Sequence, residues 1–408
     1  MSEDPFFELS GDSTWNACIG SQGDELHYVD GYIEAAWELA NAIIEKKMLG
    51  KRDTLVLPIL YNARHAVELI LKYVVGQLAA FGAIPSGHPV NHDIQSHYDF
   101  LVAGDVGDEK IRQHLQALRP FVESLARIDD DGQELRYHVN RKGETSLKGE
   151  SLANIGVIRD SLKQLNELIE AFKNRTIDFV DECAGKAHTP RCSRSDLVSI
   201  AKMMPALSEW RSDAFIIAKE AVKERFRLSN KQFAKAIDAI KTSREMMGML
   251  GAETELPNLT DEEILLVVRE WRKLHPPPAD RKPRIILGSD IKAEDLIKHS
   301  KELRAATKSL SAVIRREEAA DLEALFYLGR DGWFPELFDE KAARIRERLG
   351  DDENLAEQIA RLLDKKNLLQ CLQKGARRAG RLALADTLAN SIAEHFGGPD
   401  DELSSAAK

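Results

Sequence analysis

The stretch from Asp53 to Ala80, DTLVLPILYNARHAVELILKYVVGQLAA, constrains the fold of this chain more than any other segment. An α-helix turns by about 100° per residue, so residues three or four positions apart share one face. On that spacing one arc is apolar and comprises Leu60, Ala63, Val67, Ile70, Leu71 and Val74. The adjoining arc carries Arg64, His65, Glu68 and Lys72. The pattern predicts a helix with one face in a core and a neighbouring face that carries charge or chemistry.

Composition favours helices throughout the chain. Charged residues make up 30% and aromatic residues 6%, and long segments are rich in Ala, Leu, Glu, Lys and Arg, which are good helix formers. We therefore predict an all-α protein. At 408 residues the chain exceeds the usual single core of roughly 100–200 residues, so we expect several domains. The net charge of −10 argues against a broadly basic nucleic-acid-binding surface but leaves room for a local basic groove.

The N-terminal segment MSEDPFFELSGDSTWNA lacks the basic start and apolar core of a signal peptide, and no apolar run predicts a membrane span. The four cysteines are scattered at low density, as is typical of a reducing compartment, so we expect a cytoplasmic protein. Cys183, His188 and Cys192 could supply three ligands to zinc, but no convincing fourth ligand follows. We therefore expect neither a metal nor a cofactor.

Two stretches have the composition of linkers. AGKAHTPRCSRSD is small and polar, and HPPPADRKPR is rich in proline. They divide the chain into residues 1–185 as a helical bundle, 194–274 as a helical middle region, 290–396 as a C-terminal helical domain and 397–408 as a disordered tail.

Within the bundle, helical periodicity predicts helices over about 29–49, 53–80, 110–127 and 152–183. Gly50 is expected to cap the first helix at its C-terminus, and Pro120 is expected to kink or divide the third. Between the last two, an acidic turn, the short extended run ELRYHV and a turn at Gly143 predict a small hairpin-like excursion.

This order of elements resembles bacterial proteins of the HEPN superfamily. The likeness spans residues 28–180 and rests on the helix reading RHAVELILK, the pair His92 and Asp93 at the head of a following segment, the RY excursion ahead of Gly143, and the closing helix. The resemblance implies a small helical bundle, often dimeric, and many members are metal-independent ribonucleases of toxin–antitoxin, abortive-infection and antiphage systems.

The usual catalytic signature of that superfamily is an Arg followed after four to six residues by a His. The bundle of this chain lacks that spacing. The one match, Arg269 with His275, lies outside the resembling region.

The candidate site residues lie on the Arg64 helix and in two later segments, around His92 and around Arg136. An Arg can bind a phosphate through two hydrogen bonds while a nearby His exchanges protons, and metal-independent RNA cleavage requires both roles. The catalytic candidates are Arg64, His65, His92, Arg136 and His138, and the supporting residues are Glu68, Lys72, Asp93 and Tyr137. Alternatively, Arg64 and Glu68 pair inside the bundle as part of a buried polar network that includes His92 and Tyr137.

Two features stand out in the C-terminal part. Five aromatic residues surround a glycine-containing turn and are expected to anchor the core between two helices: Phe326, Tyr327, Trp333, Phe334 and Phe338. A basic stripe on one predicted helix could bind phosphate or an acidic partner, or could be a solvated face, and it comprises Lys374, Arg377, Arg378 and Arg381.

Two hypotheses follow for the function. The first is a HEPN-like effector of a bacterial toxin or antiphage defence system that cuts or binds RNA and acts as a homodimer. The second is a non-catalytic helical scaffold or regulatory subunit that binds a cognate partner protein. The clustered Arg and His residues favour the first, and the missing Arg–His spacing favours the second.

Overall fold

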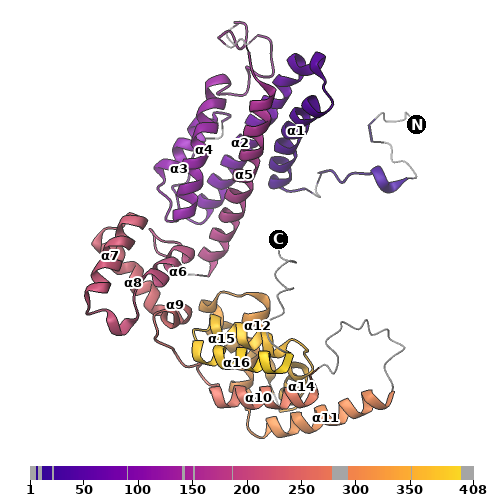
Figure 1. The fold of residues 1–408 in the computed structure, drawn as a ribbon, viewed down its shortest axis with the longest axis vertical. Helices are drawn as coiled ribbons and strands as arrows, with labels where there is room; N and C mark the ends of the chain where they lie inside the picture. The colour runs from indigo at the N-terminus through magenta and orange to yellow at the C-terminus, as the bar shows by residue number, and fades with distance from the viewer. Residues whose placement is uncertain are drawn as a thin grey trace. The chain divides into compact units, whose positions relative to one another are not determined.

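A computed structural model describes residues 6–7, 12–20, 23–89, 91–139, 143–149, 152–185, 187–277, 293–350 and 352–396. The chain forms two compact units, Met1–Cys183 (unit 1) and Ala184–Lys408 (unit 2), and each is described by itself. The predicted all-α class is confirmed: over the described ranges the regular elements are helices, and extended pairing is limited to isolated bridges (Figure 1).

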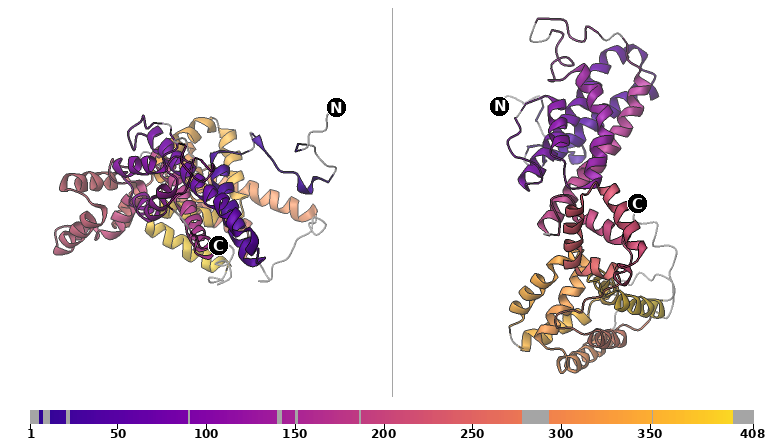
Figure 2. Two further views of the ribbon diagram at one scale, coloured as in Figure 1. Left: turned by 90° about the horizontal axis from the view of Figure 1, so that it is seen from above. Right: turned by 90° about the vertical axis from the view of Figure 1, so that its left-hand side faces the viewer.

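The described part of unit 1 is a bundle of α-helices with short 3-10 helices. They are η1 (Ser13–Trp15), α1 (Glu25–Glu45), η3 (Leu49–Lys51), α2 (Arg52–Ala80), α3 (Ile94–Ala103), α4 (Glu109–Ile128) and α5 (Ile155–Ala184). Helix α1 packs along α2, and α3 packs against both α2 and α4 (Figure 1 and Figure 2). The predicted apolar stripe of α2 lies in the core of unit 1, where Val67, Ile70 and Leu71 are fully buried. Spacing alone therefore identified the central helix.

The predicted cap at Gly50 is wrong. Helix α1 ends at Glu45, because Lys47 adopts the left-handed conformation with φ 50°. The Met48 N–H then donates to the Ile43 oxygen at 2.9 Å, and the Lys47 N–H donates to the Ile44 oxygen at 3.2 Å. These two bonds form a Schellman motif, in which glycine is common but not obligatory.

Two further local predictions differ from the structure. Helix α4 continues through Pro120 without division, and the exposed position of this proline leaves the carbonyl that loses its donor accessible to water. The first half of ELRYHV is a turn and not a strand. In its second half Val139 forms an antiparallel bridge with Thr145, so the predicted hairpin-like pairing is confirmed there. The buried carboxylate of Asp129 accepts hydrogen bonds from the backbone N–H groups of Gln133, Glu134 and Leu135, at 2.8, 3.1 and 3.2 Å. These three bonds hold the segment in a turn around the Asp129 side chain.

The rest of the described helices lie in unit 2. They are α6 (Arg194–Met203), η4 (Leu207–Glu209), α7 (Asp213–Phe226), α8 (Asn230–Thr242), α9 (Arg244–Met249), α10 (Asp261–Leu274), α11 (Ala293–Ser311), α12 (Arg316–Asp331), η6 (Pro335–Leu337), α13 (Phe338–Leu349), α14 (Asp352–Leu363), α15 (Leu368–Arg378) and α16 (Leu382–Phe396).

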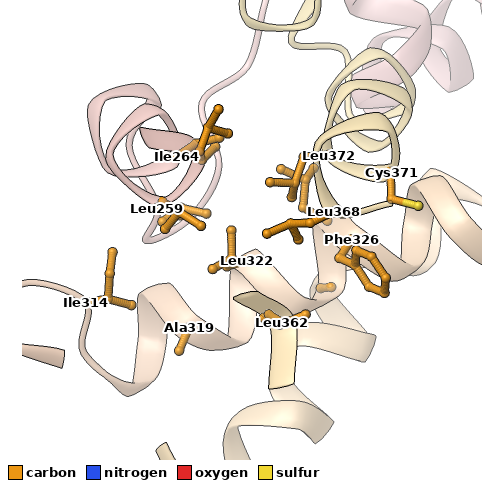
Figure 3. Packing of buried hydrophobic residues seen from close by; sticks show 14 of the residues in the cluster. Leu259, Ile264, Ile314, Ala319, Leu322, Phe326, Leu362, Leu368, Cys371 and Leu372 are labelled. Carbon is orange, nitrogen blue, oxygen red and sulfur yellow. The ribbon is translucent and has the colours of Figure 1, made fainter. Parts of the chain in front are cut away.

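Two hydrophobic clusters fill unit 2. The first contains residues of α6, α7, α8 and α9. The second contains residues of α10 together with residues of the helices from α11 onward. Figure 3 shows Ile264 of α10 and Leu322 of α12 in that second interior. Helix α10, which precedes the proline-rich stretch, thus shares a core with the helices that follow it. Residues 278–283 of that stretch and the tail 397–408 lie outside the described residues, and the proposed domain boundaries stay predictions.

Four of the five predicted anchor residues belong to the second cluster or pack against it, whereas Phe334 lies against Arg194, whose guanidinium carbon is 5.2 Å from the ring centroid. Phe326 and Phe338 are buried, and Tyr327 stacks on Trp333 with ring centroids 5.7 Å apart. Beside these rings, α12 and α15 approach so closely that a Cβ added to Gly329 would lie 1.9 Å from the Cys371 oxygen. Only glycine fits at that contact.

One helical stretch in the described residues, Leu49–Ala80, is long and apolar enough to cross a membrane by length and composition, which the sequence analysis did not anticipate. Its buried side chains, which run from Ile59 to Leu78, belong to the core of unit 1. In this structure the stretch therefore serves as a core helix of the bundle.

Candidate functional site on helix α2

One face of α2 carries four polar or ionisable side chains at helical spacing: Tyr61, His65, Glu68 and Lys72, here called the α2 polar face. The Glu68 side chain is buried, with 2% of its surface exposed, whereas His65 and Lys72 are 22% and 29% exposed. A buried acidic group thus lies between partly exposed basic groups.

Arg64 lies behind this face, in the interior. Its side chain is 1% exposed. Nη1 donates to Glu68 Oε2 at 2.5 Å, Nε donates to the Asp129 oxygen at 2.9 Å, and Nη2 donates to the Asp130 oxygen at 2.8 Å and also to the His92 oxygen. The guanidinium is therefore used internally, where it anchors two loops to α2. Arg64 and Glu68 thus pair inside the bundle with His92 beside them, as the alternative interpretation had it, whereas Tyr137 is 53% exposed and is not among these partners.

Glu68 is the centre of the face. Its Oε1 accepts hydrogen bonds from Lys72 Nζ at 2.6 Å and His92 Nδ1 at 2.8 Å, and its Oε2 lies 3.8 Å from His65 Nδ1. Burial by itself would raise the pKa of Glu68, but the donors on His65, Lys72, Arg64 and His92 outweigh burial and hold that pKa well below its usual range. Glu68 is therefore a carboxylate at neutral pH.

His92 forms a histidine–carboxylate pair with Glu68 at the edge of the bundle. A carboxylate can only accept hydrogen bonds, so the 2.8 Å contact assigns the proton of the neutral ring to His92 Nδ1. Nε2 is then the basic nitrogen. The His92 side chain is 62% exposed, so this imidazole is open to solvent while its orientation is set by a buried group.

The loop that carries His92 is braced by a second histidine pair. His97 Nε2 contacts the Asn91 oxygen at 3.2 Å, and His97 Nδ1 contacts His88 Nε2 at 2.6 Å. Burial lowers the pKa of His97, which favours the neutral ring that this arrangement requires. Sequence reasoning passed over both residues, although their spacing beside the His92 loop was visible.

An aromatic and cationic group adjoins the other end of the face. His65 stacks on Tyr61 with centroids 5.7 Å apart and meets the edge of Tyr32 at 4.5 Å. The Arg136 guanidinium carbon lies 5.5 Å from the Tyr61 ring centroid and 5.4 Å from that of Tyr137. Tyr61 and Tyr32 were missed at the sequence level; the four-residue step from Tyr61 to His65 was the one available signal.

The remaining candidates have other positions. Asp93 caps α3, since its carboxylate accepts the Ser96 N–H at 3.0 Å. His138 is exposed, and its backbone oxygen accepts from Ser146 at 2.9 Å. The structure therefore gathers His65, Glu68, Lys72, His92, Arg136 and Tyr137 around α2, keeps Arg64 inside and uses Asp93 as a helix cap.

The predicted basic stripe is broken, because α15 ends at Arg378 and Arg381 lies beyond Gly380, and its arginines are engaged within unit 2. Arg377 pairs with Asp386 at 2.9 Å, and Arg381 pairs with Asp261 at 2.5 Å. Arg378 donates to the Gly332 oxygen at 2.9 Å and to the Trp333 oxygen. Lys374 is exposed.

Comparison with protein-family models, with curated proteins and with solved structures gives no match to this chain. Among the described residues no group of three or more His, Cys, Asp or Glu side chains could hold a metal ion, and Cys183, His188 and Cys192 form no such group. The case for a function therefore rests on the geometry of the α2 polar face.

Proposed function

We propose that this chain is a HEPN-like effector of a bacterial toxin or antiphage defence system, and that its N-terminal bundle cleaves RNA without a metal. The observation that carries the proposal is the pair formed by buried Glu68 and exposed His92, 2.8 Å apart. A carboxylate that orients an imidazole through a hydrogen bond is the arrangement that general-base catalysis needs.

His92 Nε2 has the role of general base in this proposal. It takes the proton of a ribose 2′-hydroxyl, and the 2′-oxygen attacks the adjacent phosphorus. The bond from phosphorus to the 5′-oxygen breaks, and that oxygen takes a proton from the solvent. The products are a 2′,3′-cyclic phosphate and a 5′-hydroxyl, so the step consumes no further reactant.

Lys72 and Arg136 are the proposed phosphate-binding residues. Lys72 is held by Glu68 at 2.6 Å but is 29% exposed, and a lysine ammonium has three hydrogens to donate. Arg136 is exposed above the Tyr61 ring, and Tyr137 is 53% exposed beside it. Aromatic rings of this kind stack with unpaired bases. Arg64 acts in this proposal as a positioning residue, because it holds the backbone at His92.

The test is cleavage of total RNA and transfer RNA by the purified full chain in the presence of a chelator. We expect cleavage by the wild-type chain and a loss of about 10²-fold or more in rate for His92→Ala, as is usual when a general base is removed. His27→Ala is the matched control, because His27 Nδ1 also contacts a carboxylate oxygen, that of Asp24, at 2.8 Å. RNA left uncut by the wild-type chain, or equal rates for both variants, would refute the proposal.

The proposal includes a homodimer through the N-terminal bundle, as the resemblance implies. Several large apolar side chains of unit 1 are exposed, including Tyr28 at 57% and Val157 at 64%. Light scattering at micromolar concentration should give twice the chain mass of 45.7 kDa. A monomer mass would remove this part of the proposal.

The burial of Arg64 favours a second candidate function, that of a non-catalytic scaffold or regulatory subunit that binds a partner protein. An Arg with four internal acceptors and 1% exposure contributes to folding and not to phosphate binding. On this alternative the wild-type chain leaves RNA intact, and substitution of Arg64 lowers the melting temperature without any other functional change.

A further inference from the structure

We propose that a groove between α11 and α14 in unit 2 binds an amphipathic helix of a partner protein that carries acidic residues beside its apolar ridge. The groove encloses about 680 Å³ and is open to solvent. Leu303 lies on its α11 side, and Ala356 and Ala360 lie on its α14 side, where the small side chains leave the space between the two helices unfilled. This surface is distinct from the α2 polar face, and the proposal does not depend on RNA cleavage.

Two hydroxyl groups in the groove lack a hydrogen-bond partner. Thr307 lines the groove and is only 9% exposed, and its Oγ1 makes no hydrogen bond within the described residues. The same holds for Ser311 Oγ, one turn further along the helix. A buried polar atom without a partner is costly, and a polar side chain of a bound ligand could satisfy it. The orphan hydroxyls therefore indicate a ligand with a polar group among its apolar side chains.

The charge at the groove has one sign. Arg304 and Lys308 line it, and among the side chains that the structure describes no acidic one does. Lys301 lies on the same edge of α11 by helical spacing and is exposed. On the α14 side, Glu357 is paired with Arg361 at 2.5 Å. Basic side chains along an apolar groove favour a partner with acidic side chains beside its ridge, by complementarity of charge.

The apolar surface continues along α11 beyond the groove. Leu296 and Ile297 share the helical face of Ser300 and Thr307, and they are 59% and 56% exposed. From Leu296 to Ser311 the helix rises by about 22 Å, which matches about four turns of a second helix. An amphipathic helix with apolar residues at three- and four-residue steps fits such a surface.

The test uses a fluorescent helical peptide of about 16 residues with leucines on one face, one central glutamine and flanking glutamates, titrated with the full chain. A twin peptide has lysines in place of the glutamates. Fluorescence anisotropy measures both affinities for the wild-type chain and for the variants Ala360→Trp, Thr307→Val and the double variant Arg304→Glu with Lys308→Glu. Lys298→Glu is the control, because Lys298 pairs with Glu302 on another face of α11.

We expect saturable binding of the acidic peptide, loss of binding in Ala360→Trp, and weakening of at least about tenfold in the double variant, which should then prefer the lysine twin. Thr307→Val should weaken binding by a smaller factor, and Lys298→Glu should leave it unchanged. Circular dichroism checks that each variant is folded.

Three results would overturn the proposal. The first is the absence of saturable binding to the wild-type chain, and the second is equal affinity for the acidic peptide and its lysine twin. The third is self-association of the full chain that Ala360→Trp abolishes, since the occupant of the groove would then be a second copy.

Discussion

Unit 1 holds two buried clusters of arginine and carboxylate that differ in one respect. In the first, Arg175 of α5 donates to Asp108 at 2.7 Å and to Glu182 at 2.8 Å, and all three side chains are at most 8% exposed. In the second, Glu68 accepts from buried Arg64 but also from Lys72 and His92, which reach solvent. The Arg175 cluster is closed, and the Glu68 cluster is open at one end.

The pairing of buried arginine with carboxylate therefore serves a different purpose in each cluster. Burial by itself would lower the pKa of Arg175, but its hydrogen bonds to Glu182 and Asp108 raise that pKa above its ordinary value, so the charges stay paired inside. The pKa of Glu68 is instead lowered, which keeps a carboxylate anion beside the exposed imidazole of His92. A closed cluster can only hold helices together, whereas an open one can also exchange protons with a substrate.

The largest effect is expected at the closed cluster. Arg175→Met should lower the free energy of unfolding by about 3–5 kcal/mol, because it removes the guanidinium that pairs with the buried carboxylates of Asp108 and Glu182. Urea denaturation followed by circular dichroism measures the loss. Arg159→Met on the same helix is the control, since Arg159 pairs with exposed Asp160 and its loss should cost within about 0.5 kcal/mol. Equal losses for both variants would mean that the Arg175 cluster contributes nothing special.

Arg64→Ala should destabilise the chain somewhat less, by about 2–3 kcal/mol, because Glu68 keeps Lys72 and His92 as partners while three carbonyl oxygens lose a donor. The control is Arg119→Ala, whose pair with Glu123 has the same four-residue spacing but is exposed, and which should cost about 0.3–0.5 kcal/mol. Thermal unfolding compares the two. A small loss of stability for Arg64→Ala would mean that the hydrogen bonds of Arg64 contribute little to the stability of the fold.

The extent of α2 and its apolar face could be predicted from residue spacing, because helical periodicity depends only on residues that are close in the sequence. The burial of Arg64 could not follow from it. Two of its acceptors, the oxygens of His92 and Asp129, lie 28 and 65 residues along the chain, and only the folded loops bring them to α2. The contact of Tyr61 with Arg136 could not be predicted either, because Arg136 lies far along the chain and only the fold places its guanidinium over the Tyr61 ring. Periodicity therefore predicted the faces of the helix but not what covers them.

The pH dependence of stability should distinguish the open cluster from exposed pairs. The pKa of Glu68 is lowered in the folded chain, so the stability that its charge contributes is complete above the unfolded value of about 4.3 and is lost as the pH falls through the lower folded value. Glu68→Gln should cost about 1–2 kcal/mol at pH 7, and the difference from wild type should shrink below about pH 4.3. For the exposed Glu123→Gln a small difference at every pH is expected.

The smallest effect on stability is expected for His92→Ala, at the open end of the Glu68 cluster. The His92 side chain is 62% exposed, and exposed ion pairs contribute about 0.2–1 kcal/mol, so the melting temperature should barely change. Lys72 and Arg64 remain to neutralise Glu68, which therefore stays paired in the variant. If RNA cleavage falls by the expected factor while stability is kept, the two measurements separate and His92 belongs to the reacting end of the cluster. If His92→Ala instead destabilises the chain as much as Arg64→Ala, the histidine is a structural member of the network, and both clusters of unit 1 are closed.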